Sequence, residues 1–115
     1  MLYEQLGGST VIRATVTVLY QRIVADPDLA PWFAGIDLGR LRAHQHAFLA
    51  AALDGPALYT GRELAEAHAG RAITGEAFDR LCEHLAASLR DLGVEPAAVS
   101  AVVERIEALR PAVVD

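Results

Sequence analysis

Apolar residues recur at steps of three and four positions along most of the chain, which is the spacing that gathers side chains on one face of an α-helix. Over residues 9–25 this pattern predicts a helix, with Ser9 or Thr10 as its N-cap. Its apolar stripe consists of Ile12, Val16, Leu19, Tyr20 and Ile23. Before this helix, residues 2–6 are expected to form a short turn that ends at a pair of glycines.

The same periodicity predicts three more helices. One occupies residues 38–53 and has Asp37 as its N-cap. Another occupies residues 76–92 and is preceded by Thr74. The last begins at Pro96, because proline is well suited to a first helical turn.

The remaining segments have the composition of loops or short turns. Residues 26–33 contain two prolines, and residues 54–61 combine glycine and proline. A short helical piece, residues 62–69, carries His68 between them and the next helix. Because the periodicity is helical nearly throughout and no repeat or linker is visible, we predict an all-α chain that forms a single domain over residues 1–115.

Three polar side chains fall where the helical pattern would place apolar ones. Tyr20 lies on the stripe of the first long helix, Gln45 lies on the stripe of the second, and His44 lies at its edge. A buried polar group without a partner costs roughly 1–3 kcal/mol. Two explanations stay open. Tyr20 and Gln45 could hydrogen-bond each other across two packed helices, or both could line a cavity that side chains do not fill.

The histidines differ in what they can bind. His68 lies on the short helical piece 62–69. It is either an ordinary surface or core histidine, or a metal ligand. His44 and His46 are two positions apart, so they point to different sides of a helix and cannot both bind one metal. His84 faces away from the apolar stripe of residues 76–92, and we expect it to be solvated.

Composition and charge narrow the function classes. The formal net charge of -5 argues against a nucleic-acid partner. Cys82 is the only cysteine, so neither an intrachain disulfide nor a thiolate metal cluster is expected. No apolar run approaches the roughly 20 residues of a membrane span, and no export signal is visible, so we expect a cytoplasmic protein. The chain also lacks GxSxG, a glycine-rich phosphate loop and paired acids, which argues against a hydrolase.

Several motifs, in this order and spacing, resemble those of the truncated haemoglobins of group I. They are LYEQLGG at the start, LYQRIVADPDL around Tyr20, WF at 32–33, AHQHAFLAAAL at 43–53 and YTGRELAEAHAGRAIT at 59–74. The resemblance covers essentially the whole chain. It implies a two-over-two helical sandwich around haem b.

The resemblance also implies roles for individual residues. His68 would be the proximal iron ligand, and Phe33 would wedge against the porphyrin. Tyr20 and Gln45 would donate hydrogen bonds to the bound gas, while Leu41 would give an apolar distal position. A preorganised donor in a dry pocket stabilises a polarised ligand well. Apolar walls are expected from Phe33, Leu41, Phe48, Leu49, Ile73, Phe78 and Leu81.

Two further roles concern the rim of the pocket and the iron. Arg42, Tyr59 and Arg71 are candidates to contact the haem propionates, and the alternative for each is a solvated surface side chain. The RAHQ motif resembles cyanobacterial members in which the histidine binds iron when no gas is present. His44 is therefore expected to bind iron opposite His68 and to be displaced by oxygen, carbon monoxide or cyanide.

The leading functional prediction is a monomeric haem protein that binds O2, CO and NO reversibly. A second is nitric oxide dioxygenase chemistry, which would need a separate reductase because no reductase domain is attached. A third is a cofactor-free helical interaction module, in which Tyr20 and Gln45 would pair with each other and His68 would be exposed. The colour of the purified protein separates the third from the first two.

Overall fold

A computed structural model describes residues 2–53 and 73–114 of the chain. Every regular element in these residues is helical, so the all-α prediction is confirmed. The elements are α1 (Leu2–Gln5), α2 (Gly8–Ala25), the 3-10 helix η1 (Ala30–Phe33), α3 (Leu38–Ala52), α5 (Gly75–Asp91), α6 (Pro96–Glu107) and α7 (Arg110–Val113). Among the described helices, none is both long and apolar enough to cross a bilayer.

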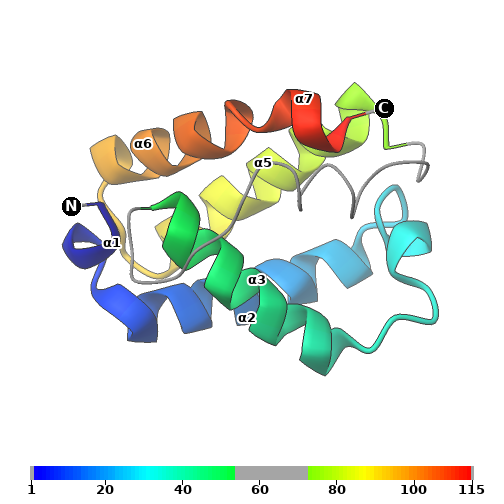
Figure 1. Cartoon of the computed structure of the whole chain (residues 1–115), viewed down its shortest axis with the longest axis horizontal. Helices are drawn as coiled ribbons and strands as arrows, with labels where there is room; N and C mark the ends of the chain where they lie inside the picture. The colour runs from blue at the N-terminus through cyan, green and yellow to red at the C-terminus, as the bar shows by residue number, and fades with distance from the viewer. Residues whose placement is uncertain (1, 54–72, 115) are drawn as a thin grey trace.

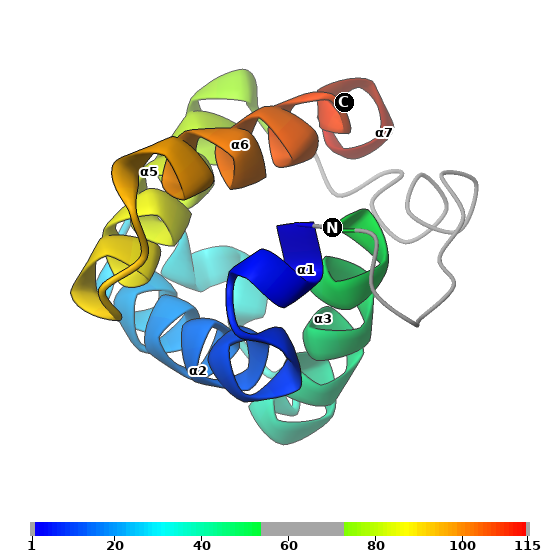
Figure 2. The ribbon, with the colours of Figure 1, turned by 90° about the vertical axis from the view of Figure 1, so that its left-hand side faces the viewer.

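The long helices form two packed pairs. Helix α2 packs against α3, helix α5 packs against α6, and contacts between α2 and α5 join the pairs (Figures 1 and 2). Helix α1 touches both α2 and α6. The most deeply buried apolar side chains come from both pairs and from the residue that follows α3: Ile12, Ile23, Leu53, Phe78, Leu89 and Val102. This is the two-over-two sandwich that the sequence led us to expect.

The predicted N-cap at Asp37 is confirmed, and Thr74, which was predicted only to precede the next long helix, also acts as an N-cap. The carboxylate of Asp37 accepts the backbone N–H groups of Gly39 at 3.0 Å and Arg40 at 3.3 Å. The hydroxyl of Thr74 accepts the N–H of Ala77 at 3.0 Å. Both helices therefore begin where a local hydrogen bond satisfies a donor of the first turn.

The predicted cap at Ser9 or Thr10 is wrong. Helix α2 begins at Gly8, and its N-cap is Gly7, which has a φ of 112° and provides no side-chain hydrogen bond. A Cβ at Gly7 would lie 2.5 Å from a methyl carbon of Val11. The sharp reversal between α1 and α2 thus requires glycine, and both hydroxyl residues are drawn into the helix.

The last predicted helix, which begins at Pro96, is divided into two helices. Helix α6 ends at Glu107, and α7 starts again at Arg110. Pro111 lacks the backbone N–H that would continue the hydrogen-bond ladder of α6. The short second helix brings Leu109 and Val113 to the edge of a cavity between the helix pairs.

Candidate functional site

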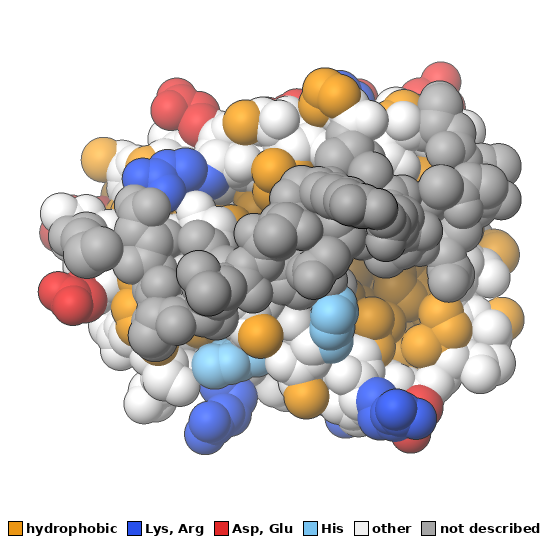
Figure 3. Space-filling model, in the orientation of Figure 1, with side chains coloured by type: hydrophobic (Ala, Val, Ile, Leu, Met, Phe, Trp, Pro, Cys, Tyr) orange, Lys and Arg blue, Asp and Glu red, His pale blue; other side chains and the backbone are white. Residues whose placement is uncertain are grey.

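A cavity of about 260 Å³ lies between the two helix pairs. Its described lining is mostly apolar, and hydrophobic side chains are visible in a hollow on one face of the molecule (Figure 3). From α2, η1, α3 and their connections the apolar lining residues are Leu19, Leu29, Trp32, Phe33, Leu41, Phe48 and Leu49. From the chain after residue 72 they are Ile73, Ala77, Phe78, Leu81, Leu85, Ile106, Leu109 and Val113.

Among the described residues, the polar part of the lining lies on one side of the cavity. Among the described lining residues, only Tyr20, His44 and Gln45 have polar side chains apart from the indole of Trp32. Tyr20 comes from α2, and the other two come from α3. The opposite wall, built by α5, α6 and α7, is apolar in its described residues. Of the described side chains, those that could donate hydrogen bonds to a flat apolar group in this cavity therefore lie on the α2 and α3 side.

Tyr20 is held in a defined orientation. Its side chain is buried, with a relative exposure of 6%. The rings of Tyr20 and Phe33 meet edge to face, with centroids 5.7 Å apart and an interplanar angle of 76°, which is a favourable aromatic geometry. Burial raises the pKa of Tyr20 above its ordinary value. The phenol therefore stays protonated and can donate a hydrogen bond into the cavity.

The two explanations for the polar positions can now be compared. In the described part of the chain, no hydrogen bond joins Tyr20 to Gln45, although both line the cavity. His44 also lines it, whereas the Nε2 of His46 lies 3.3 Å from the hydroxyl of Ser9 on another side of α3. The prediction that these two histidines point in different directions is confirmed. In the described residues, Tyr20 and Gln45 thus line a cavity and do not pair with each other.

The structure brings most of the predicted pocket residues together. All seven apolar residues predicted for the walls line the cavity: Phe33, Leu41, Phe48, Leu49, Ile73, Phe78 and Leu81. That they contact a porphyrin stays a prediction. Arg42 is exposed and is not among the lining residues, so its role also stays a prediction. His68, Tyr59 and Arg71 lie outside the described residues.

Several further residues line the cavity that the sequence did not predict to reach it. Ile106, Leu109 and Val113 bring the end of the chain to the cavity, and Leu19 and Leu85 form parts of its deeper wall. Their spacing was visible in the sequence. However, an apolar stripe that packs against another helix has the same period as one that faces a cavity, so spacing alone could not assign them.

The prediction that His84 is solvated is wrong. Its Nε2 lies 2.7 Å from a carboxylate oxygen of Asp26, and its side chain is only 23% exposed. Asp26 is separated from His84 by 58 positions and directly follows α2. Helix periodicity places His84 off the α5 stripe, but the face it occupies is covered by the turn after α2.

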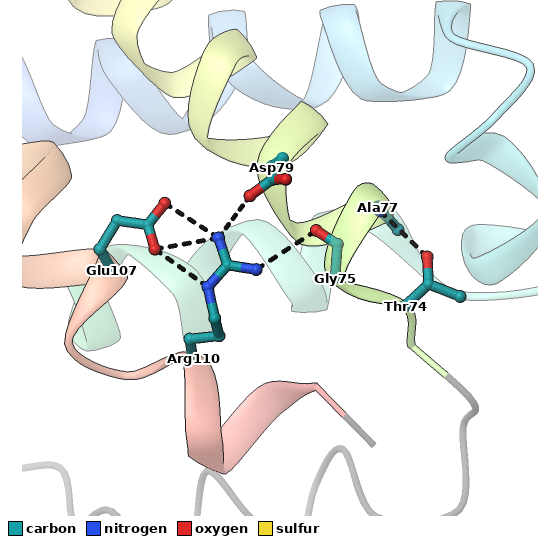
Figure 4. Close-up of polar contacts among 6 residues, drawn as sticks. All are labelled: Thr74, Gly75, Ala77, Asp79, Glu107 and Arg110. Carbon is teal, nitrogen blue, oxygen red and sulfur yellow. Dashed lines mark hydrogen bonds and ion pairs between the residues drawn. The ribbon is translucent and has the colours of Figure 1, made fainter.

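Arg110 fastens α7 to α5 (Figure 4). Its guanidinium forms an ion pair with Asp79 and another, at 3.0 Å, with Glu107, and it donates to the carbonyl of Gly75 at 3.4 Å. It also lies 4.7 Å from the ring centroid of Phe78, within cation–π range. The hydrogen bonds to Asp79 and Glu107 raise the pKa of Arg110, so it remains charged.

We expect Arg110→Gln to loosen this attachment in a salt-dependent way. The carboxylate partners are half exposed, so screening should weaken the attraction. Urea unfolding followed by circular dichroism should give a modestly lower midpoint for the variant at low salt and a smaller difference at about 1 M NaCl. Arg90→Gln, at an exposed position of α5, is the matched control. A difference that does not depend on salt would contradict the electrostatic role.

The sequence of this chain is similar to those of known globins. The family described as bacterial-like globin matches residues 1–115. A group 1 truncated haemoglobin of Synechocystis is 40% identical over 97 residues, covering 81% of this chain and 78% of that protein. One from Mycolicibacterium paratuberculosis is 37% identical over 110 residues, covering 96% and 81%.

The backbone of this chain is also similar to those of solved truncated haemoglobin structures. The Fe(III) form of the Tetrahymena pyriformis truncated haemoglobin superposes with a TM-score of 0.92 at 34% identity, covering 98% of this chain and 97% of that one. A 2/2 haemoglobin of Synechococcus, in the cyanomet state with covalently attached haem, gives a TM-score of 0.90 at 28% identity, covering 97% and 96%. The similarity therefore extends over nearly the whole length of each chain.

Proposed function

The chain belongs to the bacterial-like globin family, and from this premise we propose that it holds haem b and reversibly binds oxygen and other diatomic gases. The observation that carries the proposal is that, in the described lining of the cavity, polar side chains gather on one side. Apolar walls suit the porphyrin, and Tyr20, His44 and Gln45 lie together on the α2 and α3 side. Haem iron supplies the bond to the gas, and the residues of this chain decide how the gas is held.

Each polar residue has a distinct proposed task. His68 is the proximal ligand, because the AHAGRAI motif places it where the family has that histidine. Tyr20 donates its O–H to the bound gas, and Gln45 provides a second donor from α3. Leu41, Phe48 and Phe33 limit entry of water, which strengthens these hydrogen bonds. Tyr59, Arg42 and Arg71 are proposed to meet the propionates.

Absorption spectra of the purified protein test the proposal. We expect a Soret band, and we expect distinct spectra for the ferric, ferrous and carbon monoxide forms. A protein that is colourless and takes up no hemin would contradict the proposal and favour a helical interaction module.

Stopped-flow mixing of the oxygenated form with NO tests the second candidate function, nitric oxide dioxygenase chemistry. Fast nitrate formation that a separate reductase can sustain would assign dioxygenase chemistry to the same pocket.

His44→Ala tests whether His44 binds iron in the absence of gas. His44 is exposed and also lines the cavity, one helical turn beyond Leu41, which supports a side chain that can turn toward the iron. We expect the gas-free ferrous parent to show a six-coordinate low-spin spectrum and the variant a five-coordinate high-spin one. Carbon monoxide should also bind the variant faster, because no side chain has to leave first. A five-coordinate spectrum in the parent that the substitution does not change would contradict this role.

A further inference from the structure

The turn that joins α2 to η1 is organised around one buried carboxylate. The Asp26 side chain is only 3% exposed. One of its oxygens lies 2.7 Å from the Nε2 of His84 and 2.9 Å from the Nε of Arg80, both on α5. A buried carboxylate is stable only where donors of this kind surround it. Asp26 therefore connects the end of α2 to the middle of α5.

The same residue also fixes the chain that follows it. Its other carboxylate oxygen accepts the N–H of Asp28 at 2.9 Å. Its backbone carbonyl accepts the N–H groups of Leu29 at 3.0 Å and Ala30 at 2.8 Å. These bonds lead directly into η1, and the N–H of Trp32 donates to the carbonyl of Leu29 at 3.2 Å. Asp26 thus sets the start and direction of η1 relative to α5.

Helix η1 in turn supports the proposed hydrogen-bond donor of the cavity. Leu29, Trp32 and Phe33 all line the cavity. Phe33 packs edge to face on Tyr20. A displacement of η1 would therefore move the ring that holds the Tyr20 phenol, although Asp26 does not itself line the cavity. A small misplacement of a hydrogen-bond donor is enough to weaken its effect strongly.

We propose that Asp26 is a positioning residue that, by fixing η1 against α5, holds Phe33 where it orients the Tyr20 hydroxyl toward bound gas. The inference rests on the proposed function for its last step, but the first step concerns only this chain. The groups that face the carboxylate are His84 and Arg80, and the charged neighbours of Arg80 are Asp28 and Glu83. The His84 hydrogen bond and Arg80 lower the pKa of Asp26 to about 2, so Asp26 is charged at neutral pH.

Asp26→Asn is the direct test, since asparagine keeps an oxygen for the N–H of Asp28 but loses the charge that His84 and Arg80 face. Two measurements are made on the full haem-containing chain. Amide hydrogen exchange at Leu29, Ala30 and Trp32 reports on η1, with Val102 in α6 as an internal reference. The rate of oxygen dissociation reports on the donor. We expect faster exchange at η1 alone and roughly tenfold faster oxygen dissociation.

Asp28→Asn is the matched control. Asp28 also faces Arg80, at 3.5 Å, but its side chain is 67% exposed, and we expect no change in either measurement. If Asp26→Asn does not fold, His84→Ala and His84→Gln replace it, because glutamine can still donate an N–H toward Asp26. Alanine should speed both η1 exchange and oxygen dissociation, and glutamine should restore values near those of the parent.

The possible results separate the two proposals. Unchanged exchange at η1 would overturn the positioning role, and so would equal behaviour of the two His84 variants. Exchange that rises equally at Val102 would show a general loss of stability and would also overturn it. If amide exchange in η1 becomes faster but the rate of oxygen dissociation does not change, η1 does not orient Tyr20. A chain that binds no haem would refute the proposed function, while hydrogen exchange would still decide whether Asp26 fixes η1.

Discussion

Replacing His68 with alanine should give a folded protein that is purified with little or no haem. The proposed axial bond is the only strong attachment that we assign to the iron on that side. Loss of supporting residues alone typically weakens metal binding 10–100-fold, so we expect loss of the ligand itself to weaken haem binding by at least about a hundredfold. Hemin titration followed at the Soret band measures this directly.

The control and the rescue make the experiment specific. His46→Ala removes another histidine, one whose Nε2 lies near Ser9, and should leave haem binding unchanged. Free imidazole added to His68→Ala should restore a parent-like spectrum, because it can supply the missing ligand. If His68→Ala keeps the spectrum and hemin affinity of the parent, the iron is held by another residue and the proposed site is wrong.

Local hydrogen bonding explains which helix boundaries could be predicted. Asp37 and Thr74 cap helices that begin within a few residues of them, and the sequence contains everything that such a cap needs. Ser9 and Thr10 have the same chemistry but do not cap α2. There, the left-handed conformation of Gly7 starts the helix earlier, because α1 must fold back onto α2 and α6. That requirement comes from tertiary packing and is invisible in a local motif.

Long-range contacts explain what the sequence could not predict about the site. Tyr20 and Gln45 could be recognised as unusual because a polar residue interrupts an apolar stripe. Leu85 and Ile106 could not, since an apolar side chain on a stripe looks the same whether it faces a cavity or another helix. The contact between Asp26 and His84 crosses 58 positions. Only the packing of α2 against α5 makes it possible.

The polar side chains that the described lining gathers on the α2 and α3 side have a physical consequence for selectivity among gases. A ligand that becomes negatively polarised on binding gains from the donors on the α2 and α3 side, and a nearly neutral ligand gains little. Because the rest of the described lining is apolar, the local dielectric is low there, and the difference between the two kinds of ligand is enlarged. The pocket should therefore favour oxygen over carbon monoxide more strongly than a wholly apolar one would.

Tyr20→Phe should remove most of this preference. Bound oxygen carries partial negative charge, so its hydrogen bond from the phenol is worth about 1.5–3 kcal/mol, and its loss should speed oxygen dissociation by about ten- to a hundredfold. Carbon monoxide dissociation should change much less. Tyr3→Phe is the matched control, since Tyr3 packs against the core but is not among the described cavity-lining residues. Flash photolysis and stopped-flow displacement measure both rates.

The pH dependence of the parent provides an independent check on the same hydrogen bond. Burial raises the pKa of Tyr20, which favours the neutral phenol and keeps the donor proton in place as the solution becomes alkaline. Oxygen dissociation from the parent should thus stay constant up to about pH 10, where an ordinary tyrosine would be half ionised. A rate that rises well below this pH in the parent but not in Tyr20→Phe would show that the phenol loses its proton early. If oxygen dissociates from Tyr20→Phe at the same rate as from the parent, Gln45 and not Tyr20 is the hydrogen-bond donor to bound oxygen.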